Sequence, residues 1–280
     1  MSVKKTGIIG YPVSHSCSPA LHGFWHREYG IEASYEAVSV SAEKLGEGVG
    51  SLFEKQGFCG VNVTIPHKQA VVGLCDHLSL SAKRLGAVNI LTLKKGEIYG
   101  DNSDGVGFLA HMQEHVELAK LLARPVILFG AGGAGRAILF ALLDAGASCV
   151  RLVNRTRKNA EDLYGTLSEK ERGRVVLMDA LSGEALRGGC LFVNASSLGM
   201  ENEPPLEVEL APLHGQALVY DIVYRPLMTP LLRAAHEKGL RPLSGLGMLV
   251  HQAVPAFEQW FGVKPVVHGE LYEMLEKELG

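Results

Sequence analysis

One segment near the middle of the chain limits the possible fold more than any other. Residues 126–153 consist of a short apolar run, a glycine-rich turn, a helical pattern and a second apolar run. In the turn, Gly130, Gly132 and Gly135 satisfy the spacing G-x-G-x-x-G, which is weak evidence alone but between a strand and a helix indicates a dinucleotide-binding βαβ unit. The first glycine permits the tight turn, the second lets backbone amides meet a pyrophosphate, and the third lets helix and strand pack closely. A structural glycine turn without cofactor is the alternative.

The residues after the second apolar run distinguish the two nicotinamide cofactors. An NAD site places an acidic residue there to bind the ribose hydroxyls. This chain instead has the sequence Asn154-Arg155-Thr156-Arg157-Lys158. A guanidinium binds a 2′-phosphate through charge-assisted hydrogen bonds, whereas a carboxylate would repel it. Because basic residues oppose the dipole at a helix N-terminus, a bound anion explains them better than a solvated helix start. The sequence therefore favours NADP.

Short apolar runs alternate with helical patterns along the rest of the chain, which is typical of an α/β protein. Strands are expected at residues 6–9, 34–38, 58–63 and 88–93, and helices at about 19–29, 42–55 and 67–74. A second series of strands is expected at residues 126–129, 149–153, 174–178, 190–194 and 218–220, with helices at about 133–145, 158–168 and 229–238. The last stretch, residues 246–279, is expected to be helical without strands.

Length and composition agree with two folded domains, since 280 residues is about where single cores stop growing. The net charge is -3 with no long run of one sign, which argues against nucleic acid as a partner. The five cysteines are widely spaced and never form a CxxC pair, as expected of free thiols in a reducing compartment. No segment resembles a signal peptide or approaches the ~20 apolar residues of a membrane span. We therefore expect a cytoplasmic protein without membrane partners.

Three polar segments in the first 105 residues have the features of a site for a small acid. Ser16 and Ser18 precede an expected helix, with Ser18 as its N-cap and Pro19 as its first residue, so that their hydroxyls form a natural carboxylate site. Lys68 stands at the start of the next expected helix, where a lysine needs a counter-charge or a task. The third segment, residues 100–105, is expected to be a loop rich in carboxylate and amide groups.

Together with the rest of the chain, these segments resemble the shikimate dehydrogenase family. The matching motifs are GYPVSHSCSPALH, GVNVTIPHK, GAVNIL, GDNSDGVGF, GAGGAGRA, NRT, VNASSLGM, YDIVYRPLMTPLL and GLGMLVHQAVPAFEQWFG, in the family's order from residue 10 to residue 262. The resemblance implies reversible NADPH-dependent reduction of 3-dehydroshikimate to shikimate, a step of chorismate and aromatic amino acid biosynthesis. A small-molecule substrate is the implied partner, and monomer and homodimer both remain open.

The resemblance also implies roles for individual residues. Lys68 and Asp104 match the catalytic pair: the lysine would supply a proton or positive charge at the developing alkoxide, and the aspartate would hold the substrate hydroxyl. The substrate-binding positions are Ser16, Ser18, Thr64, Asn89, Tyr224 and Gln252. The cofactor-binding positions are Gly130, Ala131, Gly132, Gly133, Ala134, Asn154, Arg155, Thr156, Met200, Gly245 and Met248. No metal is expected.

The implied architecture has two domains with an active-site cleft between them. Residues 105–244 would form a Rossmann domain that binds NADP. Residues 1–104 would form an α/β substrate domain to which residues 245–280 return, so that this domain is discontinuous in sequence.

Several alternatives stay open. A quinate/shikimate dehydrogenase that uses NAD would carry an acidic residue after Asn154, but the first acids are Glu161 and Asp162. Methylenetetrahydrofolate dehydrogenase shares the two-domain plan without these substrate motifs. A non-catalytic NADP-binding module would have no need of the catalytic pair. Within residues 154–159, Arg157 and Lys158 both remain candidates to assist Arg155.

Histidines supply further patterns. His111-x-x-Glu114-His115 formally matches an inverted zinc-protease motif, but a polar helix face explains it better and no further ligand is evident. His22 and His26 are interpreted as packed or surface histidines, and His67 as a structural one.

Overall fold

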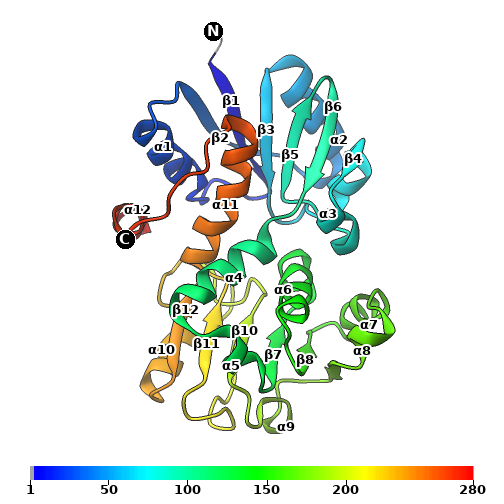
Figure 1. Cartoon of the computed structure of the whole chain (residues 1–280), viewed down its shortest axis with the longest axis vertical. Coiled ribbons are helices and arrows are strands. Elements are labelled where there is room, and N and C mark those ends of the chain that lie inside the picture. Colours follow the sequence, from blue (N-terminus) through cyan, green and yellow to red (C-terminus); the bar gives the residue numbers. More distant parts are fainter. Residues whose placement is uncertain (1–2, 280) are drawn as a thin grey trace. The chain divides into compact units, whose positions relative to one another are not determined.

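The computed structural model describes residues 3–279. The chain folds into two compact units, each with its own six-stranded sheet (Figure 1). The first unit comprises the residues up to Asp104 together with Leu249–Glu278, and the second comprises Gly105–Met248. The chain returns to the first unit inside helix α11 (Leu246–Phe261), after Met248, whereas the sequence placed the border at residue 244.

The sheet of the first unit is mixed, with strand order β2-β1-β3-β5-β6-β4. Its strands are β1 (Lys4–Gly10), β2 (Ala33–Ser39), β3 (Phe58–Val63), β4 (His77–Leu78), β5 (Ile90–Lys94) and β6 (Glu97–Asp101). Strand β1 is parallel to β2 and β3, whereas β5 is antiparallel to both β3 and β6. The four predicted strands are confirmed. Strand β6 was missed because its turn uses Lys95 and Gly96, both at positive φ, where asparagine-glycine is the usual hairpin signal.

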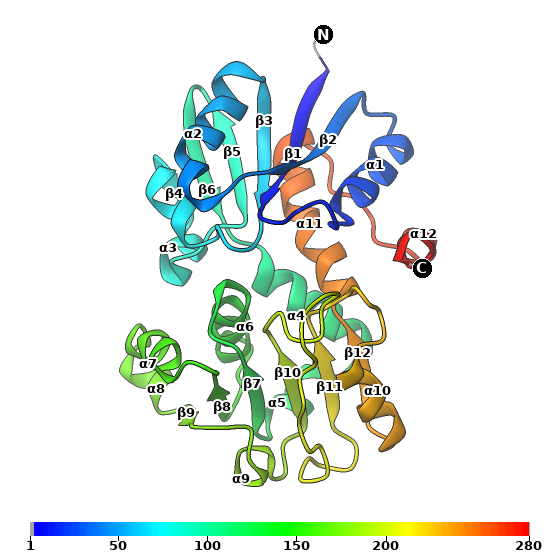
Figure 2. The same cartoon turned by 180° about the vertical axis from the view of Figure 1, so that it is seen from behind.

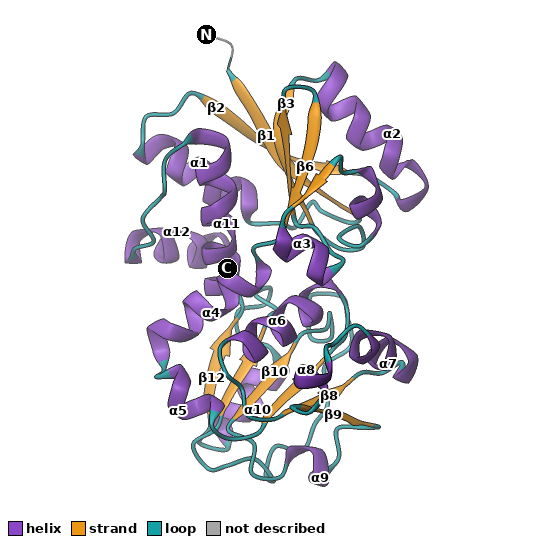
Figure 3. Cartoon of the chain, turned by 45° about the vertical axis from the view of Figure 1, so that its right-hand side comes forward, coloured by secondary structure: helices purple, strands orange, loops and turns teal. Residues whose placement is uncertain are grey.

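Helices cover both faces of this sheet. Figure 3 shows α1 (Ser18–Glu28) and α11 on one face and α2 (Leu45–Gly50) on the other. The remaining helices are η1 (Ala42–Lys44), η2 (Ser51–Lys55), η3 (Ala70–Leu74), α3 (Leu80–Leu85) and α12 (Gly269–Leu279). A buried cluster that includes Leu52, Phe58 and Leu91 forms the core on the α2 face.

Two helix predictions in this unit are corrected. Residues 42–55 form three consecutive pieces, a 3-10 helix, an α-helix and a π-turn, rather than one α-helix. Residues 67–74 contain only the 3-10 helix η3, because Val71, Val72 and Gly73 are poor helix formers. Lys68 therefore lies in a turn and not at a helix start.

The sheet of the second unit is entirely parallel. Its strands are β7 (Val126–Phe129), β8 (Val150–Val153), β9 (Val175–Met178), β10 (Leu191–Asn194), β11 (Leu218–Asp221) and β12 (Arg241–Ser244). Their order, β9-β8-β7-β10-β11-β12, is the doubly wound Rossmann order, and Figure 2 shows the last five side by side. The predicted fold class is confirmed. Strand β12 was missed because it contains Pro242, which sheets tolerate at an edge.

The helices of the second unit connect these parallel strands. They are α4 (Asp104–His115), α5 (Leu118–Leu122), α6 (Gly133–Asp144), α7 (Arg157–Gly165), α8 (Glu169–Arg172), α9 (Gly183–Leu186) and α10 (Pro230–Glu237). Ile127, Phe192 and Val219 are fully buried at the centre of the sheet and belong to the main core cluster of this unit. Among the described residues, no helix is long and apolar enough to cross a membrane.

Candidate active site

The topology of the first sheet collects the predicted substrate segments at one edge. Parallel strands β1 and β3 both end there, antiparallel β5 begins there, and β6 ends there again. Backbone hydrogen bonds join the segments: the Val88 amide donates to the Lys68 carbonyl at 2.7 Å, and the Asn89 amide donates to the Asp101 carbonyl at 3.0 Å. Lys68, Asn89 and Asp104 therefore come together although they are far apart in sequence.

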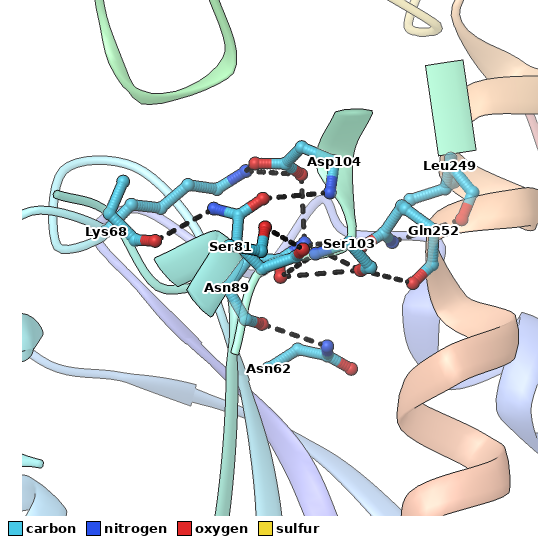
Figure 4. Close-up of polar contacts among 10 residues, drawn as sticks. Asn62, Lys68, Ser81, Asn89, Ser103, Asp104, Leu249 and Gln252 are labelled. Atoms are coloured by element: carbon cyan, nitrogen blue, oxygen red, sulfur yellow. Dashed lines mark hydrogen bonds and ion pairs between the residues drawn. The ribbon is translucent and has the colours of Figure 1, made fainter. Parts of the chain in front are cut away.

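Lys68 and Asp104 form a close ion pair (Figure 4). The Lys68 Nζ atom lies 2.9 Å from Oδ1 and 2.7 Å from Oδ2 of Asp104, so that it donates to both oxygens. The lysine side chain is 16% exposed and the aspartate side chain 4% exposed. Asp104 is also the first residue of α4, where a carboxylate is favoured by the helix dipole. The counter-charge that Lys68 needed is thus Asp104, and the lysine side chain is not fully buried by the pairing.

Asn89 connects this pair to α11. Its Nδ2 atom lies within hydrogen-bond distance of Asp104 Oδ1 (2.9 Å), Ser103 Oγ (3.1 Å) and Gln252 Oε1 (3.1 Å). Its Oδ1 atom accepts a hydrogen bond from the Ser103 amide at 2.9 Å. Because an amide nitrogen carries two hydrogens, these three acceptors share two donors. One of the three acceptors is therefore left to accept a hydrogen bond from a bound ligand.

Segment 100–105 is not a free loop as predicted. Asp101 ends strand β6, and Asp104 begins α4. The side chains between them face inward: Asn102 Nδ2 donates to the Ala87 carbonyl at 3.1 Å, and Ser103 Oγ donates to the Gln252 carbonyl at 2.7 Å. This bonding holds the Asp104 carboxylate in position.

Ser16, Ser18 and Thr64 lie in segments that follow β1 and β3 at the same edge of the sheet. Ser18 is the first residue of α1 and not its N-cap; the N-cap is Cys17, which makes no side-chain cap bond. Ser16 Oγ accepts a hydrogen bond from the Ser18 amide at 3.2 Å, which fixes Ser16 beside the start of the helix. Within residues 3–279, no hydrogen bond joins these three side chains to Lys68. Tyr224, the remaining predicted substrate residue, belongs to the second unit and is half-buried.

The glycine-rich turn of the second unit has the geometry of an anion site. A Cβ atom on Gly130 (φ +117°) would lie 2.8 Å from the Ala195 backbone, and one on Gly135 would lie 2.1 Å from the Gly130 carbonyl oxygen. A Cβ atom on Gly132 would meet nothing within 4 Å. Gly132 is the N-cap of α6, whose first turn has no acidic residue and no side-chain cap. The α6 N-terminus, with Gly133 and Ala134, therefore offers amide groups of the kind that bind a pyrophosphate, whereas the Ala131 amide beside them already has an acceptor in Asn154.

The basic residues in and after the loop that follows β8 differ in whether they have acidic partners. Arg157 pairs with Glu161 at 3.0 Å and with Asp179, and Lys158 pairs with Asp162. Arg155 is exposed and has no hydrogen-bond or ion-pair partner within the described chain. Asn154 joins this loop to the glycine turn, since its Oδ1 accepts from the Ala131 amide at 3.0 Å and its Nδ2 donates to the Thr156 carbonyl at 2.8 Å. Of the three basic residues in this loop, Arg155 thus has no acidic partner among residues 3–279.

The three predicted nicotinamide positions occupy different environments in the second unit. Met200 is exposed and Met248 is buried. Gly245 packs so tightly that a Cβ atom would lie 2.0 Å from the Ile222 carbonyl oxygen.

Asp221 is a residue that the sequence reasoning missed. Burial raises its pKa to about 6. The carboxylate accepts hydrogen bonds that act in the opposite direction, from Thr229 Oγ1 (2.7 Å), the Val223 amide (3.1 Å) and Asn194 Nδ2 (2.9 Å). These bonds fix both ends of the segment that carries Tyr224 and join it to the end of β10. An acid directly after a buried apolar strand was the available signal.

His67 and His22 were interpreted from the sequence as structural or packed histidines, and the structure agrees with this. His67 is buried, and its Nε2 atom lies 2.6 Å from the Val40 carbonyl oxygen. His22 is fully buried and stacks on Tyr35 with ring centroids 4.0 Å apart.

Comparison with known proteins agrees with this geometry. Residues 8–91 match the shikimate dehydrogenase substrate binding domain, and residues 245–267 match the shikimate 5′-dehydrogenase C-terminal domain. The NADP(+) shikimate dehydrogenase of Acidiphilium cryptum is 46% identical over 273 residues, which cover 98% of this chain and 96% of that protein.

Solved structures show the same fold along the whole chain. The shikimate 5-dehydrogenase of Thermus thermophilus, solved in complex with NADP(H) and shikimate, is 35% identical with a TM-score of 0.84, covering 99% of this chain and 98% of its own. The quinate dehydrogenase of Corynebacterium glutamicum, in complex with NAD, is 30% identical with a TM-score of 0.84, covering 99% of both chains. The extent and identity of these matches show that the chain belongs to the shikimate dehydrogenase family.

Proposed function

We propose that this protein catalyses the reversible NADPH-dependent reduction of 3-dehydroshikimate to shikimate. The observation that carries the proposal is the partly buried Lys68–Asp104 pair at 2.7 Å, joined through Asn89 to Gln252 at the edge of the first sheet. Family membership supports the reaction type. The Acidiphilium cryptum relative and the Thermus thermophilus enzyme, solved with NADP(H) and shikimate, support this substrate and cofactor.

We assign substrate binding to the first unit and NADP binding to the second. Ser16, Ser18 and Thr64 would bind the carboxylate and a ring hydroxyl, because they line the segments that leave the same sheet edge as Lys68. Gln252 would bind a ring hydroxyl through Oε1, which competes with two other acceptors for the Asn89 hydrogens, and Asn89 would bind one by exchanging one of these contacts for the ligand. Tyr224 would contact the substrate from the segment that Asp221 fixes.

The chemistry of reduction follows from the placement of the ammonium group. When bound, NADPH supplies a hydride to the carbonyl carbon of the substrate. Negative charge then develops on the carbonyl oxygen, and Lys68 Nζ can donate a proton to it or stabilise it as a cation. Asp104 keeps the ammonium oriented through its two short contacts and accepts a hydrogen bond from the neighbouring substrate hydroxyl. In the oxidation direction, the proton of the shikimate hydroxyl returns to Lys68.

Residues of the second unit account for the preference for NADP. The amides at the α6 N-terminus would hold the pyrophosphate, and Arg155 with Thr156 would hold the 2′-phosphate, with Asn154 fixing the loop. Arg157 and Lys158 already carry acidic partners, so among the three basic residues of the loop we assign the phosphate contact to Arg155. Met200, Gly245 and Met248 would lie near the nicotinamide.

Initial rates of shikimate and quinate oxidation, each with NADP and with NAD, test this proposal through the absorbance of the reduced nicotinamide. We expect kcat/KM for shikimate with NADP to exceed the other three combinations by about tenfold or more, a difference of roughly 1.4 kcal/mol in transition-state binding. Faster turnover of quinate or with NAD would instead place the protein with the NAD-dependent quinate enzymes. An absence of turnover with all four combinations would favour a binding module.

A further inference from the structure

The C-terminal end of α4 carries a cluster of three potential metal ligands that the proposed reaction does not use. One ligand atom each of His111, Glu114 and His115 lies within 4.8 Å of the other two. All three residues belong to the second unit, in which α4 lies beside β11 (Figure 1). The sequence pattern was attributed to a polar helix face for want of a further ligand. The structure shows that the motif's own three side chains converge.

We propose that His111, Glu114 and His115 bind a divalent cation of the zinc class, such as Zn²⁺, Co²⁺ or Ni²⁺. Two imidazoles and one carboxylate are the ligand set that these ions accept, whereas Mg²⁺ and Ca²⁺ prefer oxygen ligands alone. The fourth position is left for water, since three protein ligands complete only part of a tetrahedral shell.

The two histidine rings already have nearly the required spacing. Their Nε2 atoms are 3.1 Å apart. Two nitrogens that bind the same Zn²⁺ ion, each at about 2.0–2.1 Å, lie only slightly farther apart than this. The ring centroids are 4.8 Å apart, less than a straight arrangement through both nitrogens would give, so the ring axes are inclined to each other. A hydrogen bond now joins the nitrogens; on metal binding its proton would move to the other nitrogen of the same ring, leaving both Nε2 lone pairs for the ion.

His111 has a hydrogen-bond partner at its other ring nitrogen, as metal-bound histidines generally do. Its Nδ1 atom lies 2.8 Å from the hydroxyl of Tyr220, a fully buried residue of β11. Metal-bound histidines generally donate their other ring N–H to such a partner, which fixes the tautomer that presents Nε2 to the ion. Gly247 leaves room for the ring, because a Cβ atom there would lie 2.2 Å from His111 Nε2. His111 is thus held in place before the metal binds.

Glu114 and His115 are both exposed, so they can adjust to the ion. The ligand atoms of a tetrahedral site lie roughly 3.3 Å apart, so that the carboxylate needs to move by at most about 1.5 Å. Bound metal would join two residues of the last turn of α4 to a ring that is already packed on β11 and on the first turn of α11. We therefore expect the ion to stabilise the second unit rather than to take part in hydride transfer.

The test is metal binding by the full-length protein without a histidine tag. Isothermal titration with Zn²⁺ and the visible absorption of Co²⁺ should give one site per chain in the wild type. His115→Ala and Glu114→Gln, both at exposed positions, should lose the Co²⁺ absorption and the rise of Tm on adding Zn²⁺. Tyr220→Phe should retain the site with affinity lowered about tenfold, as loss of an outer-shell partner does.

His236→Ala is the matched control, because His236 is an exposed histidine of the same unit that lies on a different helix, α10. It should bind Zn²⁺ as the wild type does, and shikimate oxidation by His115→Ala should be unchanged, which shows that the fold is intact. The same titration on protein whose thiols have been alkylated shows whether the five free cysteines bind the metal. Equal Zn²⁺ binding by the wild type and His115→Ala, or no binding by the wild type, would overturn the proposal.

Discussion

The two candidate sites of this protein differ in how their polar groups are satisfied. At the edge of the first sheet, Lys68, Asn89 and Asp104 bond to one another and are largely buried. At the glycine turn of the second unit, Arg155 has no partner within residues 3–279, and the space beside Gly132 is open. The side chains of the first site are thus held in position by one another, whereas those of the second site have space and charge that a ligand can use. Changes in the first should therefore alter the chemistry, whereas changes in the second should alter cofactor affinity.

Removal of the lysine charge tests the first half of this comparison most directly. Lys68→Met should lower kcat for shikimate oxidation by about 10²–10⁴-fold, the usual contribution of a positioned acid or base, with substrate affinity near the wild-type value. Steady-state kinetics and equilibrium binding of shikimate measure the two quantities. Lys83→Met, at an exposed position of α3, should behave as the wild type. An effect confined to KM would remove the catalytic assignment of Lys68.

Removal of the unpaired guanidinium tests the second half. Arg155→Ala should raise KM for NADP by about 10- to 100-fold, since hydrogen bonds to charged groups contribute about 1.5–3 kcal/mol, and should leave KM for NAD nearly unchanged. Arg157→Ala is the control, because Arg157 already pairs with Glu161 and Asp179. If Arg157→Ala weakened NADP binding as much as Arg155→Ala, the ion pairs would not decide which residue holds the phosphate.

Substitution of two glycines of the turn tests packing and ligand binding separately. Gly135→Ala should lower the free energy of unfolding by about 1–3 kcal/mol or more, because its Cβ would overlap the Gly130 carbonyl oxygen. Gly132→Ala should stay within about 1 kcal/mol of the wild type, as for a change of N-cap, yet bind NADP more weakly. Urea denaturation and fluorescence titration with NADPH measure the two effects. Wild-type NADPH affinity in Gly132→Ala would show that the open space is not where the pyrophosphate lies.

The smallest effect concerns a buried histidine in the core of the first unit. Burial lowers the pKa of His22 well below its usual value, and His26 lowers it further. Neither ring nitrogen has a hydrogen-bond partner in the described part of the chain. Because the unfolded chain protonates this ring near pH 6.5 and the folded chain does so only at lower pH, stability should fall as the pH drops below about 6.5. His22→Leu should raise the free energy of unfolding by about 1 kcal/mol at pH 7, and by more at pH 5.

Urea denaturation of the wild type and His22→Leu at pH 7, 6 and 5 makes this measurement. His236→Leu, at an exposed position, should keep the acid dependence of the wild type. An identical pH dependence in His22→Leu would show that the ring is solvated and not a source of acid sensitivity.

Local sequence patterns sufficed for much of the fold. The strands β1, β3 and β7 and the helix α6 were predicted from apolar runs and the glycine turn, because these signals lie within a few residues of one another. The predictions failed where local signals were weak or misleading. The proline-containing edge strand β12, the Lys95–Gly96 hairpin and the region around Lys68 are the examples.

The sequence by itself determined the fold class, the glycine turn and the family to which the chain belongs, since all three rest on short motifs and their order. Only the tertiary structure decided which side chains meet. Lys68 and Asp104 are 36 positions apart, and antiparallel β5 and β6 bring them to one edge of a mixed sheet. Asn89 and Gln252 are 163 positions apart and meet because helix α11 packs against that edge. The same holds for Arg155, which is distinguished from Arg157 and Lys158 because it forms no ion pair with any acidic residue that the structure describes. Strand order and helix packing set such distances, and no local pattern encodes them.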